Sequence, residues 1–272
     1  MGDYKSISKW IDAMAVRGRH IFTKSELRAA FPDKSEEVAK TDLSRLLANG
    51  TIVSPWQNFY VIVPTEYKLK GIVPPEFYLD RLMKHLGCNY YIALLNAAEM
   101  FGAAHQRPQN FTVFVEGKSL RSGIKGGTEL LIHRRKKLPM DFIRKFQTQT
   151  GYVNVSSPEL TALDLVGSEL DVGGLTRVST VLAELAEEIY FSTVSSELLN
   201  YFKAPVIQRL GYLLDAVLDE REKSDELFAL SQSAKIHFRK VALKTSKAVS
   251  DDCELNKRWK IVVNQKIEID EL

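Results

Sequence analysis

The first 64 residues place three short amphipathic helices ahead of a tight β-hairpin, and few folds accommodate that order. The apolar residues of the first segment recur at a spacing of three and four: Ile7, Trp10, Ile11 and Met14. That spacing predicts a helix over residues 6–16 with one buried face. Thr23 and Glu26 have the form of a capping box, which predicts a second helix that ends near Phe31, because Pro32 follows.

A third helix is expected to begin near Asp33 or Ser35 and to stop at Asn49-Gly50. It would bury four apolar side chains: Ala39, Leu43, Leu46 and Leu47. It would direct five polar ones outward: Glu37, Lys40, Thr41, Ser44 and Arg45. Residues 51–53 and 59–63 then form a hairpin about a turn at 54–58. The order predicts a winged helix-turn-helix.

The outer face of the third helix favours double-stranded DNA as the ligand. Lys34, Lys40 and Arg45 are long enough to reach phosphates or guanine edges. Thr41 and Ser44 are short enough to let the helix enter the major groove, whereas Glu37 opposes binding. The alternative is an ordinary helical subdomain used for protein contacts, which has the same order of elements.

Charge is uneven along the chain. Residues 1–64 hold nine basic and seven acidic side chains, so strong phosphate contacts must come either from the arrangement of these charges or from cations elsewhere in the chain. Residues 116–150 hold nine basic and three acidic side chains, and 151–233 hold five and fourteen. The first of these blocks includes a second basic patch: Arg134, Arg135, Lys136 and Lys137. It is either a solvated face or a source of the missing phosphate contacts.

We expect two domains, residues 1–64 and 76–272, joined by a proline-marked linker at 65–75. In the second domain the periodicity predicts these helices: 76–86, 89–101, a helix from Ser157-Pro158, 175–189, 196–202, 205–218 and 224–230. Strands are expected at 111–115, 128–134, 152–155, 236–238 and 259–263, and a further helix is expected to begin at the end of the 116–150 block. The fold class is α+β and helix-rich.

The sequence contains no secretory signal and no apolar run of about 18 residues, and Cys88 and Cys253 lie far apart. A soluble cytoplasmic protein with no membrane partner is therefore expected. No heptad repeat or obvious dimer helix appears, so the sequence leaves the oligomeric state open. We expect a monomer in solution that pairs only on DNA.

Several segments together resemble the AbiEi family of abortive-infection antitoxins. They span most of the chain: 60–64, 66–67, 78–83, 90–98, 102–106, 153–165 and 259–264. The resemblance implies a bacterial protein with a type IV toxin–antitoxin role in phage defence. An N-terminal winged helix would repress its own operon through inverted repeats. A C-terminal domain would counteract a nucleotidyltransferase-like toxin without a stable complex.

The family assigns no catalytic residues, but it places the predicted DNA contacts on two elements. Those on the helix-turn-helix are Lys24, Ser25, Lys34, Ser35, Lys40, Thr41, Ser44 and Arg45, and those on the wing are Gln57, Asn58 and Tyr60. Two copies on an inverted repeat would then bind cooperatively. The alternative function is a protein-interaction module that neutralises the toxin or another protein by direct contact.

Enzymatic activity is not expected. A nucleotidyltransferase needs a Gly-Ser turn followed about ten residues later by paired carboxylates, and Gly167-Ser168 is not followed by such a pair. Residues 129–134 lack the acidic pair and lysine of a restriction-type nuclease, and 125–128 lack the upstream glycine of a P-loop. The five histidines show no metal-ligand spacing, so neither a metal nor a cofactor is expected.

Overall fold

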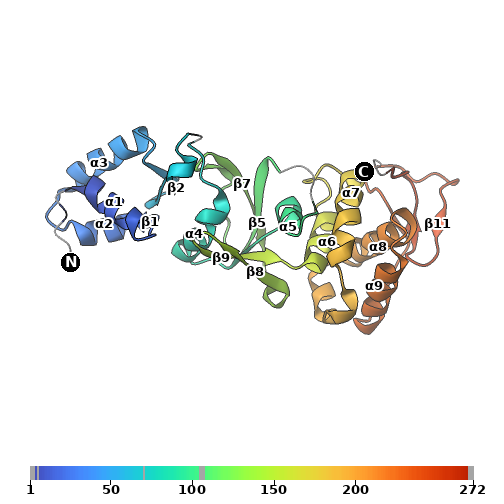
Figure 1. Ribbon diagram of the computed structural model, residues 1–272. Coiled ribbons are helices and arrows are strands. Elements are labelled where there is room, and N and C mark those ends of the chain that lie inside the picture. Colours follow the sequence, from blue (N-terminus) through green and yellow to red (C-terminus); the bar gives the residue numbers. More distant parts are fainter. Residues whose placement is uncertain (1–3, 5, 70, 104–107, 269–272) are drawn as a thin grey trace. The chain divides into compact units, whose positions relative to one another are not determined.

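A computed structural model describes residue 4 and residues 6–69, 71–103 and 108–268 (Figure 1). The chain has mixed α and β structure, as predicted, and it divides into two compact units. Unit 1 comprises Met1–Tyr91, Gln109–Leu138 and Lys145–Asn154, and unit 2 comprises Ile92–Pro108, Pro139–Arg144 and Val155–Leu272. Because the units interleave along the sequence, they differ from the predicted domains, and the functional division at 64 and 76 stays a prediction.

Local capping signals set the first three helices of unit 1. Helix α1 (Ile7–Val16) begins after Ser6, whose side chain accepts a hydrogen bond from the Lys9 amide. Helix α2 (Lys24–Ala30) begins with the predicted capping box, in which Thr23 and Glu26 satisfy each other's amides. Helix α3 (Glu36–Ala48) begins after Ser35. All three expected helices are present.

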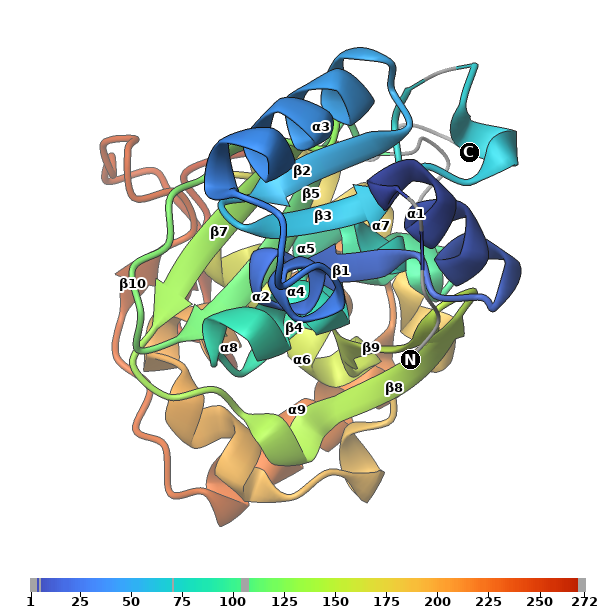
Figure 2. The same ribbon diagram turned by 90° about the vertical axis from the view of Figure 1, so that its left-hand side faces the viewer.

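A three-stranded sheet accompanies these helices (Figure 2). Its antiparallel strands β1 (Ile21–Thr23), β2 (Ile52–Trp56) and β3 (Phe59–Ile62) lie in the order β1-β3-β2. The turn of the β2–β3 hairpin is shorter than the predicted 54–58, because β2 continues to Trp56 through an irregular register. Asn58, at φ 61°, adopts the left-handed conformation that closes the turn.

The predicted apolar face of α1 packs against Phe22, Leu27, Leu43 and Leu46 in one core. Leu47 was expected in this core, but its side chain is 39% exposed. Successive helical residues are 100° apart, so a helix that centres Leu43 and Leu46 on its inner face turns Leu47 toward its flank.

The predicted linker contributes to a second core in unit 1. Val73 is fully buried and packs with Ile21, Phe59 and Val61. The same core includes Phe77, at the end of a short 3₁₀ helix (Pro75–Phe77). Residues 65–75 are therefore held at their C-terminal end by the small sheet.

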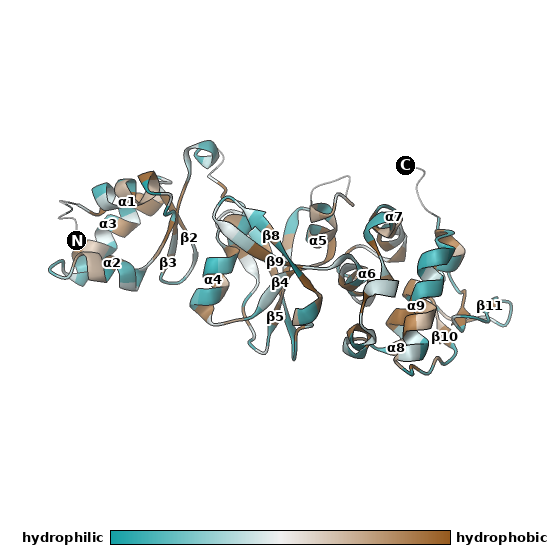
Figure 3. Cartoon of the chain, turned by 60° about the horizontal axis from the view of Figure 1, so that its bottom comes forward, coloured by the Kyte–Doolittle hydropathy of each residue, from teal (hydrophilic) through white to brown (hydrophobic). Residues whose placement is uncertain are grey.

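The larger sheet has six strands in the order β6-β7-β5-β4-β9-β8. The elements of this region are α4 (Leu79–Leu86), β4 (Tyr90–Ile92), α5 (Leu94–Met100), β5 (Asn110–Glu116), β6 (Gly123–Lys125), β7 (Thr128–Arg135), β8 (Ile143–Thr148) and β9 (Gly151–Ser156). Strands β5 and β7 pair in parallel from Asn110↔Glu129 to Glu116↔Arg135. Strands β5, β6 and β7 belong to unit 1, and β4, β8 and β9 have residues in both units. Strands β4 and β5 are largely buried, while Figure 3 shows that α4 carries hydrophilic residues.

Two predictions in this region are wrong. Residues 90–92 form strand β4 rather than the start of a helix over 89–101. All three are buried, and periodicity cannot distinguish a short, fully apolar strand from a buried helix. Residues 143–148, expected to begin a helix, form β8. His105 and Gln106, part of the segment resembling AbiEi, lie outside the described residues.

Unit 2 is mainly helical. Its remaining elements are α6 (Pro158–Gly167), α7 (Leu175–Leu185), a 3₁₀ helix (Ser196–Tyr201), α8 (Ala204–Tyr212), a π-helical continuation (Leu213–Val217), α9 (Arg221–Ser233), β10 (Val241–Ala242), β11 (Leu255–Asn256) and β12 (Ile261–Val262). The expected strand at 236–238 is absent, and the short strands β10, β12 and β11 form a third sheet.

Candidate nucleic-acid interface

Helix α3 presents one polar face to solvent. Lys40, Thr41, Ser44 and Arg45 are all exposed, as predicted from their spacing. The Thr41 hydroxyl donates to the Glu37 carbonyl at 2.9 Å, which keeps this side chain against the helix. Thr41 and Ser44 place short side chains between the two cations, and the exposed Glu37 lies one turn before Thr41 on the same face.

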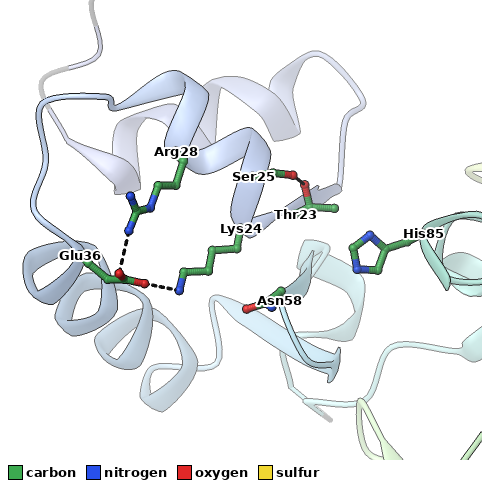
Figure 4. A pocket seen from close by; sticks show the side chains of 7 residues that line it. All are labelled: Thr23, Lys24, Ser25, Arg28, Glu36, Asn58 and His85. Carbon is green, nitrogen blue, oxygen red and sulfur yellow. Dashed lines mark hydrogen bonds and ion pairs between the residues drawn. The ribbon is translucent and has the colours of Figure 1, made fainter.

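An acidic side chain holds two cations at the start of this helix. Glu36 makes ion pairs with Lys24 and with Arg28, the latter at 2.9 Å between Glu36 Oε2 and Arg28 Nη2 (Figure 4). The hydrogen bond from Lys24, followed by the charges of Lys24 and Arg28, lowers the pKa of the exposed Glu36 carboxyl. Glu36 therefore remains an anion at neutral pH.

The three charged side chains line an open pocket of about 410 Å³. Thr23, Ser25, Asn58 and His85 line the rest of it (Figure 4). The backbone fixes the relation of two of its walls, since the Lys24 amide donates to the Asn58 carbonyl at 2.9 Å. The pocket thus joins the start of α2 to the turn of the β2–β3 hairpin.

Two further residues predicted to contact DNA form ion pairs with the same aspartate. Lys34 Nζ lies 3.0 Å from Asp42 Oδ2, and Arg45 Nη1 lies 3.9 Å from Asp42 Oδ1. Lys34 is half-buried, whereas the Arg45 side chain is 69% exposed. Arg45 is therefore the more available of the two to an incoming anion.

The hairpin residues differ in accessibility. Gln57 and Asn58 are exposed at the turn, as a wing requires. Tyr60 is half-buried, and its ring stacks on Phe22 with centroids 5.2 Å apart. Burial raises the pKa of the Tyr60 hydroxyl, although the charge of Lys24 opposes the shift. Most of the Tyr60 ring therefore packs against the core. Ser25 is exposed, and Ser35, also exposed, caps α3.

The members of the second basic patch differ in their exposure. Arg134 and Lys136 are exposed at the end of β7 and beyond it, and Lys137 is exposed as well. Arg135 is held. Its Nη1 donates to the Tyr91 hydroxyl at 2.7 Å, and its guanidinium lies 4.3 Å from the centroid of the Phe114 ring. Arg135 is therefore a packing residue of unit 1.

One contact of the hairpin was not predicted. Lys125, in β6, places Nζ 4.4 Å from the centroid of the Trp56 ring, and the Tyr78 hydroxyl donates to the Lys125 carbonyl. These contacts bring part of the basic 116–150 block beside the hairpin. Lys125 and Trp56 lie far apart in the sequence, so no sequence pattern predicts their contact. The ion pair of Glu36 with Arg28 was not predicted either, because it depends on how α2 packs on α3.

The division within the patch predicts different effects on stability. Arg135→Met is expected to lower the free energy of unfolding by about 2 kcal/mol, because it removes a charged hydrogen bond and a cation–π contact. Arg134→Met should change it by less than about 0.5 kcal/mol, because the side chain is exposed. Urea denaturation of the two variants checks this, and equal effects would contradict the assignment of Arg135 to packing.

Comparison with known proteins finds a family that part of the chain resembles. Residues 91–216 match the model of the AbiEi antitoxin C-terminal domain. This segment is therefore similar to an AbiEi antitoxin C-terminal domain, which confirms the resemblance predicted from the sequence. A search of curated proteins finds no significant match.

A solved structure shares the fold of this chain at low sequence identity. The RV2827C protein from Mycobacterium tuberculosis matches with a TM-score of 0.66 and 14% identity, over 94% of this chain and 90% of that one. At this identity the likeness shows a common fold. An antigenic nucleotidyltransferase-like protein from Paracoccidioides brasiliensis matches with a TM-score of 0.39 and 12% identity, over 56% of this chain and 89% of that one. That score is too low to indicate a shared fold.

Two negative observations apply to the described part of the chain. It contains no helix with the length and apolar character needed to span a bilayer. It also contains no cluster of three or more His, Cys, Asp or Glu side chains arranged to hold a metal ion.

Proposed function

We propose that the chain is a DNA-binding antitoxin of a type IV toxin–antitoxin system that represses its own operon through inverted repeats. The observation that carries the DNA-binding part is the face of α3, where Lys40 and Arg45 flank the short side chains of Thr41 and Ser44. A helix of this shape fits the major groove, and its cations reach phosphates or guanine edges.

The order of elements supports a winged helix-turn-helix in residues 1–64. Helices α2 and α3 are joined by a short turn and lie between β1 and the β2–β3 hairpin, and all three strands form one sheet. In this proposal α3 is the recognition helix, and the exposed Gln57 and Asn58 are the tip of the wing.

In this proposal, base recognition and phosphate binding are carried out by different residues. Base edges would be read by α3, while phosphate contacts set the register and most of the salt-dependent affinity. The first 64 residues carry little net charge, so the exposed cations of the second patch, Arg134, Lys136 and Lys137, add phosphate contacts in this proposal. Arg135 has a structural role instead.

The antitoxin part of the proposal is supported by the AbiEi domain at residues 91–216. We infer a nucleotidyltransferase-like toxin as the functional partner, counteracted without a stable complex and without catalysis by this chain. The protein would work in the bacterial cytoplasm as a monomer that binds DNA cooperatively. The alternative, an interaction module that contacts the toxin directly, predicts no sequence preference for DNA.

A reporter gene placed behind the region upstream of the chain's own gene tests the proposal in cells. Expression of the chain is expected to lower reporter output, because the protein would occupy the inverted repeats. Scrambling one half of the repeat should restore output, since the two copies bind cooperatively. Reporter output that does not change when the chain is expressed or when the repeat is scrambled would favour the interaction module.

A further inference from the structure

Glu36 occupies an unusual place for an acidic residue in a surface proposed to bind DNA. It lies in the first turn of α3, next to the face formed by Lys40, Thr41 and Ser44. Its own side chain is 59% exposed, and those of Lys24 and Arg28 are 40% and 52% exposed. None of the three is buried, so solvent or a phosphate can compete for each of them.

Both carboxylate oxygens of Glu36 are engaged. Oε1 pairs with Lys24 and Oε2 with Arg28, and Figure 4 shows the two cations, both from α2, converging on it. Two cations four residues apart on one helix face, with one anion between them, resemble a phosphate site occupied by an internal carboxylate. A DNA phosphate that approaches Lys24 or Arg28 competes with Glu36 for these cations.

We propose that Glu36 is a specificity-determining residue that holds Lys24 and Arg28 away from DNA phosphates until the operator is docked. This inference rests on the proposed DNA-binding function. In a non-specific complex the two cations stay with Glu36. In the operator complex, base contacts from α3 hold phosphates next to α2, and the cations exchange from the carboxylate to those phosphates.

The energetics of exposed ion pairs suit such an exchange. A pair between exposed side chains is worth little, so it breaks readily once a phosphate is held nearby. A doubly paired carboxylate nevertheless suppresses two sequence-independent contacts. Glu36 would thereby lower affinity for non-specific DNA more than affinity for the operator.

The test compares Glu36→Gln with the wild type on an operator duplex and on a scrambled duplex, across a salt series. Glutamine keeps the shape and removes the charge. We expect affinity for the scrambled duplex to rise about fivefold, and its log–log salt slope to steepen by up to about 2, because two cations are released. The operator slope should stay the same, so the specificity ratio falls.

Two controls separate this role from a general change of charge. Asp12→Asn removes one exposed negative charge from α1, where no ion pair of the described residues involves Asp12. This substitution should change the affinity for the two duplexes slightly and by the same factor. In a Lys24→Met/Arg28→Met background, Glu36→Gln should have no more effect than Asp12→Asn, because the cations that it holds are gone.

The outcomes distinguish the inference from the proposed function. If the wild type prefers the operator, but Glu36→Gln changes the affinity for both duplexes by the same factor, the inference is wrong and the proposed function stands. If the wild type binds both duplexes alike, the proposed function fails and the inference fails with it. Circular dichroism and thermal unfolding of each variant establish that the fold is intact.

Discussion

Gly211→Ala is expected to lower the free energy of unfolding by about 3 kcal/mol or more, because the new methyl group has no room. A Cβ atom at Gly211, inside α8, would lie 2.2 Å from Cζ2 of the Trp259 indole. Trp259 cannot move away easily. It is fully buried, its Nε1 donates to Ser224 Oγ, and its carbonyl accepts from Gln208 Nε2. The substitution should therefore displace the C-terminal segment that resembles AbiEi.

Gly167→Ala is the matched control. Gly167 ends helix α6 of the same unit, and its added Cβ would meet only Val206, at 3.8 Å, which is an ordinary contact. This variant should be as stable as the wild type or slightly more stable, because alanine favours helix. Urea denaturation compares the two. Equal stability of both variants would show that Trp259 does not pack on α8 as described.

The second large effect is expected from replacing Lys40, Thr41 and Arg45 together with alanine. If α3 reads the operator, operator affinity should fall at least about 100-fold, since each base contact contributes about 1–3 kcal/mol. Stability should change by less than about 0.5 kcal/mol, because all three side chains are exposed and alanine suits a helix. Fluorescence anisotropy with a labelled duplex measures the affinity.

A charge-matched control accompanies the triple variant. Lys9→Ala/Arg17→Ala removes two exposed cations from the region of α1 and should lower affinity for operator and scrambled duplexes alike. Protection from the toxin should survive the triple substitution if the AbiEi domain acts alone. A triple variant that still represses would exclude α3 as the reading helix.

The sequence predicted those features that depend on neighbours along the chain. The capping box at Thr23 and Glu26 fixed the start of α2, and the spacing of Ile7 to Met14 fixed the inner face of α1. Prediction from short sequence patterns was wrong where the secondary structure depends on burial by distant segments. Tyr90–Ile92 is a strand because it is enclosed on both faces, and that enclosure comes from segments distant in sequence.

The candidate interface was predicted in outline only. Exposure of the α3 face followed from its periodicity, but the ion pairs of Glu36 depend on how α2 packs on α3. The role of Arg135 was also hidden, because a run of four basic residues does not show which member meets Tyr91. The close approach of Gly211 to Trp259 requires a tertiary contact that no local pattern contains.

The most direct test of the central claim is binding of the purified chain to a fluorescent duplex from upstream of its own gene, against a scrambled duplex, across a salt series. We expect tight, sequence-selective binding with a steep salt slope, because several cations would release counterions from the DNA. Equal and weak binding to both duplexes would contradict it, and the interaction module would become the leading explanation.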